Sequence, residues 1–390
     1  MREAPLTEVV GRYYAYMAAS TLGFLTPVWV LLLETRGFSF TEIALLDSVF
    51  FAALVVSEIP TGYLGDRLGR RNALVLGTLG VAGAAAAFGL AESFVGFLGV
   101  YLAWAVATTL RTGNDSAWLY DALDAHGRAA SFAAVRGRGL AAFLGVGAVA
   151  SVAGGYLFTL DPRYPFFATA AVNTVAAGVL LTFPEFDGRD GTRFTVGDAA
   201  TAVRRLSRPG LRGFVLYLAA FWAVGWSADL FVQPVTTRAG LDAVGLGLLY
   251  AGFTAVSAVA VNYADRIASA AGLGRLLGVS PFLLGGVFVA VALAPALAVP
   301  AFLTARLLLN VTAPVAEGYL NDRTPSLGRA TALSAFSMAV SLATIPVKLV
   351  AGPLADRSLF LALGALGAGL LVVAAVLFAW ERPVADPPAR

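Results

Sequence analysis

This chain repeats one pattern from end to end: long apolar stretches separated by short polar breaks, twelve times over. A helix must carry roughly 20 apolar residues to cross about 30 Å of hydrocarbon, and these stretches reach that length. Inside lipid every backbone N–H and C=O must be paired within the protein, which a helix achieves by itself. The pattern therefore predicts an all-α membrane protein with twelve transmembrane helices.

The polar breaks give the expected boundaries. We place the spans at residues 12–33, 41–62, 73–91, 94–120, 138–160, 164–183, 211–233, 244–264, 276–296, 299–320, 330–354 and 358–380. The widest break predicts an N-terminal six-helix bundle over 1–184, a cytoplasmic linker over 185–210 and a C-terminal six-helix bundle over 211–390. Within the linker, residues 194–206 suit either an amphipathic helix on the inner membrane surface or a solvated tether.

Composition excludes several classes of function. Only 13% of the residues are charged and the mean hydropathy is +0.78, whereas a soluble domain carries charge on about a quarter of its residues. The chain has no cysteine and a single histidine, His126, so neither thiolate nor histidine metal sites are expected. No nucleophile with its base, and no glycine-rich phosphate loop, can be identified. The sequence predicts no enzyme activity, no ATP hydrolysis and no cofactor.

The arginines are distributed unevenly between the two sides of the expected spans. Of the 26 arginines, 20 lie in the termini and loops of one side, four in the loops of the other side, and two within spans. The positive-inside rule assigns the arginine-rich side, and both termini with it, to the cytoplasm. Topology therefore accounts for the sequence pI of 9.2, and no nucleic-acid partner is expected. We expect a multi-pass monomer of the cell inner or plasma membrane.

Two features indicate an internal duplication and a specialised inner loop. The turn Gly62-Tyr-Leu-Gly-Asp-Arg-Leu-Gly-Arg-Arg71 joins the second and third spans and is too charged to lie in hydrocarbon. Its Asp66-Arg67 recurs as Asp265-Arg266 in the other half, and Gly127-Arg128-Ala129 recurs as Gly328-Arg329-Ala330. Parallel six-span repeats of this kind place a substrate site near the middle of the membrane, between the repeats.

This inner loop resembles the cytoplasmic loop motif of the major facilitator superfamily, and the likeness covers nearly the whole chain. The resemblance implies two pseudo-symmetric six-helix bundles and a bacterial, drug-exporter-like transporter. It also implies that Asp66 docks near the start of the eleventh span, at Arg329. In this arrangement the basic residues that follow latch the inner side, namely Arg67, Arg70 and Arg71. The alternative is that these arginines only set the topology.

One departure from the family pattern concerns the fifth span. Antiporters of this group usually carry a glycine-proline pair ahead of a double glycine, whereas this chain keeps Gly154-Gly155 and has Ala150-Ser151 in place of the pair. Small residues at these positions still allow close helix packing. The missing proline weakens the inference of export, but not the inference of fold.

Eight ionisable side chains fall inside the expected spans, where a charge costs on the order of 2.5–3.5 kcal/mol and needs a partner. The outer four are two acids and two bases, the composition expected for a closed gate: Asp47, Asp229, Arg306 and Lys348. Lys348 is the only lysine and no residue one turn away can neutralise it, so we predict an outer bridge from it to Asp229 or Asp47. The alternative is that Lys348 snorkels to the outer surface.

The inner four are three acids and one arginine: Glu58, Arg111, Asp115 and Glu317. An excess carboxylate there is a candidate proton carrier, because desolvation disfavours its charged form. Arg111 and Asp115 lie four residues apart on one expected helical face. They either form a permanent structural pair or exchange partners with a proton or substrate. Glu317 is the second candidate carrier, whereas Glu58 has a structural alternative beside the loop motif.

By resemblance, the first, fourth, seventh and tenth spans line a central cavity, and in this chain they are rich in aromatic and amide side chains. Aromatic faces with a few polar atoms suit an amphipathic organic solute. The predicted substrate-binding residues are Met17, Asn114, Trp118, Trp222, Trp226, Asp229, Gln233 and Asn310. For an aromatic residue near a span end the alternative is an interfacial anchor, and Gln233 with Pro234 also suits a helix end.

Together these features predict a secondary active transporter that exports a small amphipathic organic compound in exchange for protons, without catalytic residues or metal. Uptake of a small organic solute by proton symport is the alternative, because the sequence does not display the direction of flow. A non-transporting membrane receptor or scaffold is a further alternative, and it predicts a cavity without exchangeable charges. Fold alone does not supply the substrate.

Overall fold

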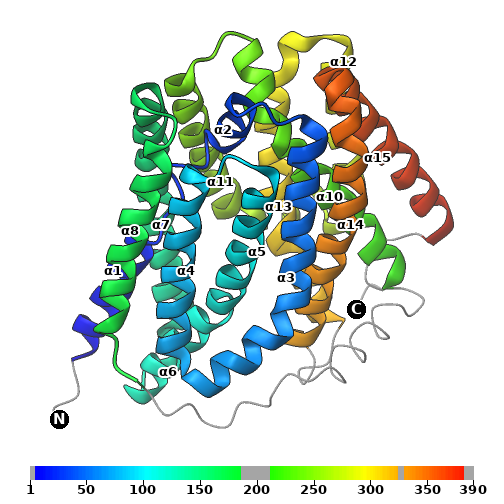
Figure 1. Cartoon of the computed structure of the whole chain (residues 1–390). Coiled ribbons are helices and arrows are strands. Elements are labelled where there is room, and N and C mark those ends of the chain that lie inside the picture. The colour runs from blue at the N-terminus through cyan, green and yellow to red at the C-terminus, as the bar shows by residue number, and fades with distance from the viewer. Residues whose placement is uncertain (1–4, 186–210, 324–328, 382–390) are drawn as a thin grey trace. The chain divides into compact units, whose positions relative to one another are not determined.

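The computed structural model describes residues 5–185, 211–323 and 329–381, and every regular element in these ranges is helical (Figure 1). The helices of the first half are α1 (Leu6–Ala19), α2 (Trp29–Thr35), α3 (Phe40–Leu68), α4 (Arg70–Leu90), α5 (Phe94–Arg111), α6 (Asn114–Ala125), α7 (Phe132–Leu160) and α8 (Tyr164–Leu181). Those of the second half are α10 (Arg212–Arg238), α11 (Ala243–Ala271), α12 (Leu273–Leu293), α13 (Ala298–Asp322), α14 (Arg329–Arg357) and α15 (Leu359–Glu381).

Most of these helices are long and apolar enough to span a membrane. Eleven helical segments in the described residues are long and apolar enough to cross a bilayer. The most apolar windows range in mean hydropathy from 1.5 in α8 to 2.6 in α15, as expected for segments whose solvent is lipid. The all-α membrane fold predicted from the apolar pattern is confirmed.

The first expected span is not one helix. The sequence predicts a continuous helix over 12–33, but α1 ends at Ala19 and α2 begins at Trp29, with irregular backbone between them. Pro27 lies in this interval and lacks the N–H that would continue a helical ladder. The span is therefore formed in two short pieces, neither of which is long enough to cross a bilayer alone.

Buried side chains satisfy the backbone at this break. Thr21 Oγ1 accepts a hydrogen bond from Gly23 N at 3.0 Å, and Asn173 of α8 donates to the Thr21 carbonyl at 3.1 Å. Asn173 is fully buried and Thr21 is 1% exposed. Irregular backbone is tolerated at membrane depth only where protein surrounds it, so α8 supports the break.

The structure divides into two compact units, which we describe separately. Unit 1 contains Met1–Leu32, Val56–Arg193 and Asp242–Thr254, and unit 2 contains Leu33–Val55, Phe194–Leu241 and Ala255–Arg390. The beginning of α3 thus belongs with α10 and α12–α15, and the beginning of α11 belongs with α4–α8. Each unit therefore contains contacts between the two sequence halves. The division of the sequence into two bundles and a linker stays a prediction.

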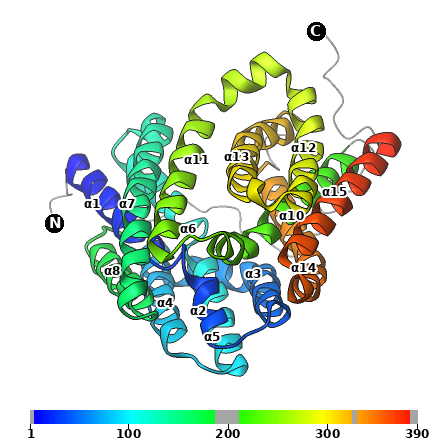
Figure 2. The ribbon, with the colours of Figure 1, turned by 90° about the horizontal axis from the view of Figure 1, so that it is seen from above.

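Each unit is built from helices packed along their lengths. In unit 1, α4 packs on α5 and α8, and α7 packs on α1. In unit 2, α10 packs on α14 and α15, and these three helices lie side by side in Figures 1 and 2. In the most apolar window of α10, 78% of the residues are buried, compared with 39% for α15. α10 is therefore enclosed by protein, and a charge on it is shielded from lipid by its neighbours.

Gly154 and Gly155 allow two close backbone approaches in unit 1. A Cβ atom built on Gly154 would lie 2.0 Å from the Phe24 carbonyl oxygen, and one on Gly155 would lie 2.2 Å from the Ala243 carbonyl oxygen. Real side chains do not approach that closely, so glycine is required at both positions. The close packing that small residues of the fifth span allow is observed at this glycine pair, and it joins α7 to the first-span break and to α11.

Replacing Gly154 by alanine should lower the free energy of unfolding by about 1–3 kcal/mol, because the added methyl group overpacks a backbone contact. The matched control is Gly145→Ala in the same helix, where an added Cβ meets nothing within 4 Å. That control should be neutral or slightly stabilising, since alanine favours a helix more than glycine does. Thermal unfolding in one detergent measures both variants, and equal midpoints would contradict the packing argument.

Candidate functional site

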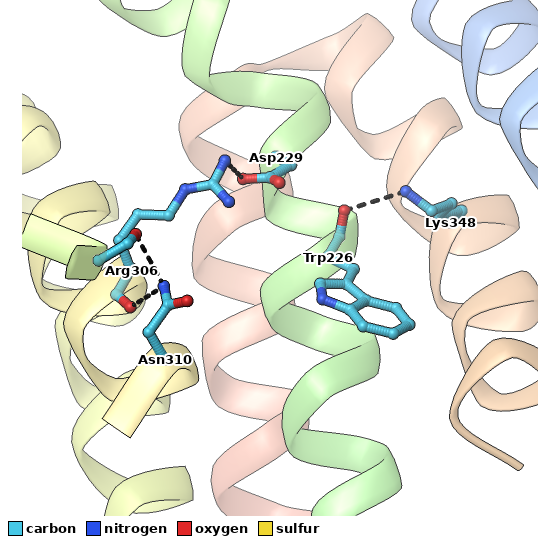
Figure 3. A network of polar contacts seen from close by, with 6 residues as sticks. Trp226, Asp229, Arg306, Asn310 and Lys348 are labelled. Atoms are coloured by element: carbon cyan, nitrogen blue, oxygen red, sulfur yellow. Dashed lines mark hydrogen bonds and ion pairs between the residues drawn. The ribbon is translucent and has the colours of Figure 1, made fainter. Parts of the chain in front are cut away.

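The four outer charges form two ion pairs. Figure 3 shows the Asp229–Arg306 pair on one side of α10 and Lys348, which contacts the Trp226 carbonyl, on the other. Lys348 Nζ lies 2.7 Å from Asp47 Oδ2, and Arg306 Nη2 lies 2.8 Å from Asp229 Oδ1. Of the two partners expected for Lys348, the structure thus places Asp47 beside it and gives Asp229 to Arg306. All four residues belong to unit 2, so both pairs are internal to one compact unit.

The Lys348–Asp47 pair is almost fully enclosed. Its side chains are 2% and 14% exposed, so the lysine lies inside the protein and does not snorkel to the outer surface. Lys348 Nζ also donates to the Trp226 carbonyl at 3.0 Å and lies 5.2 Å from the centroid of the Phe51 ring. The ammonium group is therefore held by a carboxylate, a carbonyl and an aromatic face, which together offset the cost of burying it.

The beginning of α3, which carries Asp47, is held by α14 a second time. Asp356 of α14 accepts hydrogen bonds from Phe40 N at 2.6 Å and Thr41 N at 3.2 Å. An acid is stabilised at a helix N-terminus, where the first backbone N–H groups have no partner within the helix. Sequence analysis missed Asp356, because nothing local to it indicates that another helix begins beside it.

Two of the outer charges lie well before the ends of their helices. α10 continues to Arg238, nine residues beyond Asp229, and nine residues correspond to about 14 Å of helix. α14 likewise continues nine residues beyond Lys348, to Arg357. Both side chains are thus well inside helices that are long and apolar enough to span a membrane, where a net charge is costly.

The side chains of the Asp229–Arg306 pair are more exposed than those of the Lys348–Asp47 pair. Its side chains are 36% and 25% exposed, although α10 is otherwise largely buried. Part of the surface of both charged side chains is thus accessible, on helices that are long and apolar enough to span a membrane. Asn310, one turn from Arg306 on α13, donates to Ser257 Oγ at 3.0 Å and to the Arg306 carbonyl at 2.7 Å. The pair and this amide form an accessible polar site in unit 2.

The other expected site residues of α10 are more enclosed. Trp222 is 6% exposed and packs edge-on against Phe336, with ring centroids 5.5 Å apart. Gln233 is fully buried. Trp226 is partly exposed, and its ring stacks on Phe51 with centroids 5.8 Å apart. On this face of α10, Trp226 and Asp229 are thus the residues with accessible surface.

Three further residues expected in the cavity make structural contacts in unit 1. Trp118 is 2% exposed, stacks on Phe183 with centroids 4.0 Å apart, and donates its indole N–H to the Pro184 carbonyl at 3.0 Å. Met17 packs at the edge of the same apolar core. Asn114 donates at 2.9 Å to a carbonyl in the last turn of α5. Their substrate contact stays a prediction, whereas their structural contacts are observed.

Arg111 and Asp115 do not share a helical face. α5 ends at Arg111 and α6 begins at Asn114, because Gly113 has a φ of +83°, which residues with a side chain rarely adopt. Asp115 lies in the first turn of α6 and accepts a hydrogen bond from Ser116 N at 2.6 Å. The expectation of one continuous face is therefore wrong, and the helix N-terminus stabilises this carboxylate.

The other two inner acids differ in exposure. Glu317 is exposed on α13, five residues before the helix ends at Asp322. Glu58 is partly buried on α3. Of the three inner acids, Glu317 is thus the one whose side chain is exposed.

Two basic residues of the inner loop make ion pairs within unit 1. Arg70 pairs with Asp121 of α6 and donates to the Ala117 carbonyl at 2.7 Å. Arg71 Nη2 lies 3.3 Å from Glu185 Oε1. These contacts tie the beginning of α4 to α6 and to the segment after α8, so both arginines do more than set the topology.

The remaining residues of the expected inner latch are described only in part. Arg67 lies over the Tyr63 ring, 4.7 Å from its centroid. The side chains of Asp66 and Arg329, the two ends of the predicted latch, lie outside the described residues. The docking of Asp66 near the eleventh span therefore stays a prediction.

Comparisons with known proteins agree with this architecture. A family profile described as Major Facilitator Superfamily matches residues 13–311. The chain is also similar to a protein of Bacillus subtilis (strain 168) described as the uncharacterized MFS-type transporter YxaM. The two are 26% identical over 156 residues, which is 40% of this chain and 38% of that relative. The match thus spans well under half of the relative's length.

Two solved structures share the fold over nearly their whole length. A bacterial homologue of the human lysosomal transporter Spinster, in an inward-facing and unoccupied conformation, gives a TM-score of 0.77 at 18% identity, covering 98% of both chains. The nucleoside transporter NupG gives a TM-score of 0.78 at 13% identity, covering 96% of this chain and 99% of its own. At these identities the likeness shows the fold.

Proposed function

The chain belongs to the Major Facilitator Superfamily of membrane transporters, and from this premise we propose that it exports a small amphipathic organic compound in exchange for protons by alternating access. The observation that supports this most is the Lys348–Asp47 pair, which ties α3 of the first sequence half to α14 of the second. Removing charges from water is costly, so the two charged side chains are stable either when they are fully paired or when each is hydrated. A contact with two discrete states is what a gate requires.

The gate closes the outer side of the transport path in this proposal. Lys348 and Asp47 hold the outer parts of α14 and α3 together, and the Asp356 contacts to the beginning of α3 reinforce them. On the inner side, Arg67, Arg70 and Arg71 with Asp66 form the second gate. Alternating access follows if one gate is open while the other is closed.

Proton coupling belongs to the inner acids. Glu317 is the first candidate, because its carboxylate is exposed within a span. Asp115 is the second, and Arg111 and Glu58 are the other ionisable groups of this inner set. Protonation removes the charge of a carboxylate and with it the cost of moving that group away from water, which links proton binding to conformational change.

The substrate site combines aromatic surface with the open ion pair. Trp226 offers a partly exposed ring, and Asp229 lies about one turn further along α10. Arg306 of α13, which pairs with Asp229, and Asn310 offer further polar atoms. Such a site holds an organic solute by its apolar area and orients it by its polar groups. We place the protein in the cell inner membrane as a monomer with both termini cytoplasmic, on the arginine distribution.

Transport is tested in sealed vesicles that contain the purified chain and an acidic interior. A panel of amphipathic cations, anions and zwitterions is added outside, and a pH-sensitive dye reports proton movement. Exchange predicts that a transported compound drives protons out of the vesicles, at a rate that saturates with compound. Protein-free vesicles are the control for compounds that cross the lipid as weak acids or bases.

Each outcome separates the proposed function from an alternative. Proton movement in the same direction as the compound would replace exchange by symport. Binding without any compound-dependent proton or compound flux, in vesicles whose protein keeps its native melting temperature, would indicate a receptor or scaffold.

A further inference from the structure

The two ion pairs of unit 2 differ in a way that a structural role for both does not explain. The side chains of the Lys348–Asp47 pair are 2% and 14% exposed, whereas those of Asp229 and Arg306 are 36% and 25% exposed. Asp229 and Lys348 each lie nine residues before the end of their helix, and Lys348 contacts the Trp226 carbonyl, three residues before Asp229 in α10 (Figure 3). One pair is thus sealed in the protein, while the other presents both of its charges to water inside a membrane-spanning region.

We infer that the Asp229–Arg306 pair is a recognition site for the charged end of a zwitterionic solute, one that carries an ammonium group and a carboxylate a few bonds apart. This inference rests on the proposed function and names the substrate class for the accessible site. Asp229 accepts the ammonium group, and Arg306 donates to the carboxylate. Arginine suits this role because its planar fork of N–H donors matches a carboxylate.

Charge balance favours a zwitterion over a singly charged solute. Asp229 and Arg306 together are neutral, and a zwitterion leaves the occupied site neutral as well. A lone cation bound to Asp229, or a lone anion bound to Arg306, would leave one uncompensated charge within the span. Uncompensated charge in a membrane interior is costly, so the site selects against both.

The contact between the two side chains also fits a ligand with two charges. The structure joins Arg306 Nη2 to Asp229 Oδ1 at 2.8 Å. A guanidinium has five N–H donors and a carboxylate has two oxygens, so each group can keep this contact and still bind a ligand charge of opposite sign. The result is a ring of four groups with alternating charge, in which every neighbour is attractive.

Neighbouring residues supply the rest of such a site. Asn310 uses the nitrogen of its amide to contact Ser257 and the Arg306 carbonyl, which leaves its carbonyl oxygen pointing to neither. This oxygen is a further acceptor for an ammonium group. Trp226 precedes Asp229 by three residues, about one turn of α10, and its partly exposed ring offers surface to an apolar substituent. The whole arrangement suits an amphipathic zwitterion such as an aromatic amino acid.

The test compares three ligands that share one aromatic body. Phenylalanine carries both charges, phenylalaninamide carries only the ammonium group, and 3-phenylpropionate carries only the carboxylate. Each is titrated against the full-length chain in nanodiscs, and binding is measured as the shift in thermal unfolding and by calorimetry, alongside further zwitterions with larger apolar groups. We expect a zwitterion to bind about 10- to 100-fold more tightly than either singly charged analogue, the effect of one charge-assisted contact.

Two variants assign the charges. Arg306→Gln should weaken binding of the zwitterion and the carboxylate analogue while sparing phenylalaninamide, and Asp229→Asn should spare 3-phenylpropionate instead. Arg238→Gln, which removes the Arg238–Glu34 ion pair at the end of α10, is the matched control and should leave all three affinities unchanged. The double variant Asp229→Asn with Arg306→Gln removes both charges together, so it tests binding without leaving one charge unpaired.

Several results would overturn the inference. These are equal affinity for the zwitterion and phenylalaninamide, equal weakening of all three ligands by each variant, or binding of none of the zwitterions. A chain that exchanges amphipathic cations for protons but binds no zwitterion would keep the proposed function and lose this inference. A chain that binds zwitterions through both residues but moves neither protons nor solute would keep the site and lose the proposed function.

Discussion

Replacing Lys348 by methionine should lower the free energy of unfolding by about 3–5 kcal/mol, the effect of removing one partner of a buried ion pair. Methionine keeps the length of the side chain but leaves Asp47, only 14% exposed, with an uncompensated charge. It also removes the additional hydrogen bond that Lys348 donates to the Trp226 carbonyl. Denaturant titration or thermal unfolding of the purified protein measures this loss.

Two control variants distinguish the stability lost with the ion pair from the stability lost with side-chain packing. Arg238→Met removes a lone Arg–Glu pair whose arginine is 53% exposed, and exposed pairs contribute at most about 1 kcal/mol. Lys348→Met combined with Asp47→Asn should recover most of the stability that the single substitution loses, because no unpaired charge remains. Equal stability of the single and double variants would show that Lys348 contributes through packing and not through its charge.

The double variant also tests the gate. Ser48 follows Asp47 in α3 and is 3% exposed, and the chain has no cysteine, so Ser48→Cys provides one hidden thiol in a clean background. If the ion pair keeps the outer side closed, an impermeant maleimide should label this thiol faster in the double variant than in the otherwise native chain. Unchanged labelling together with full transport by a well-folded Lys348→Met variant would eliminate the gate.

The transmembrane helices could be predicted from sequence because their cause is local. An apolar run in lipid favours a helix, because a helix pairs its own backbone groups, and the structure has helices in all the expected intervals. The glycine pair at Gly154 and Gly155 was also predictable as a place of close packing. What the sequence did not show is which backbones approach there, because Phe24 and Ala243 are remote in the chain.

The errors concern features that depend on partners from other helices. The break in the first span needs Asn173 of α8 to satisfy the Thr21 carbonyl, and Pro27 alone does not reveal this support. The turn at Gly113 separates Arg111 from Asp115, although both residues lie in one apolar run. The apolar run was recognised by the hydropathy of its residues, and hydropathy does not show that a single glycine within the run adopts a positive φ.

The choice of ion-pair partners was also beyond the sequence. Asp47 and Asp229 are both acids at suitable depth, and the sequence left both open as partners of Lys348. The structure separates them, because Asp47 on α3 approaches Lys348 while Arg306 on α13 takes Asp229. The choice of ion-pair partner depends on which faces of the helices are in contact, and the hydropathy of the helices does not reveal those contacts. The difference in exposure between the two pairs has the same origin.

Replacing Glu317 by glutamine should abolish substrate-driven proton movement while exchange of labelled for unlabelled substrate continues. Glutamine keeps the shape of the side chain but cannot take up or release a proton. Glu317 is exposed on α13 five residues from the helix end, so its carboxylate has access to water and hydrogen bonds from it. Its removal should therefore change coupling and not stability, in contrast to Lys348→Met.

The control for this substitution lies on the same helix. Asp322→Asn neutralises an exposed carboxylate about one and a half turns further along, at the end of α13. Because this carboxylate is exposed, the loss of its charge should have little effect on the protein. It should retain proton movement at the native rate.

Asp115→Asn tests the second candidate proton carrier, because a carrier at the beginning of α6 would give the same loss of proton movement as Glu317→Gln. If proton movement in vesicles is native in both Glu317→Gln and Asp115→Asn, neither acid carries the proton. Coupling must then be sought at Glu58, the inner acid that α3 keeps partly buried.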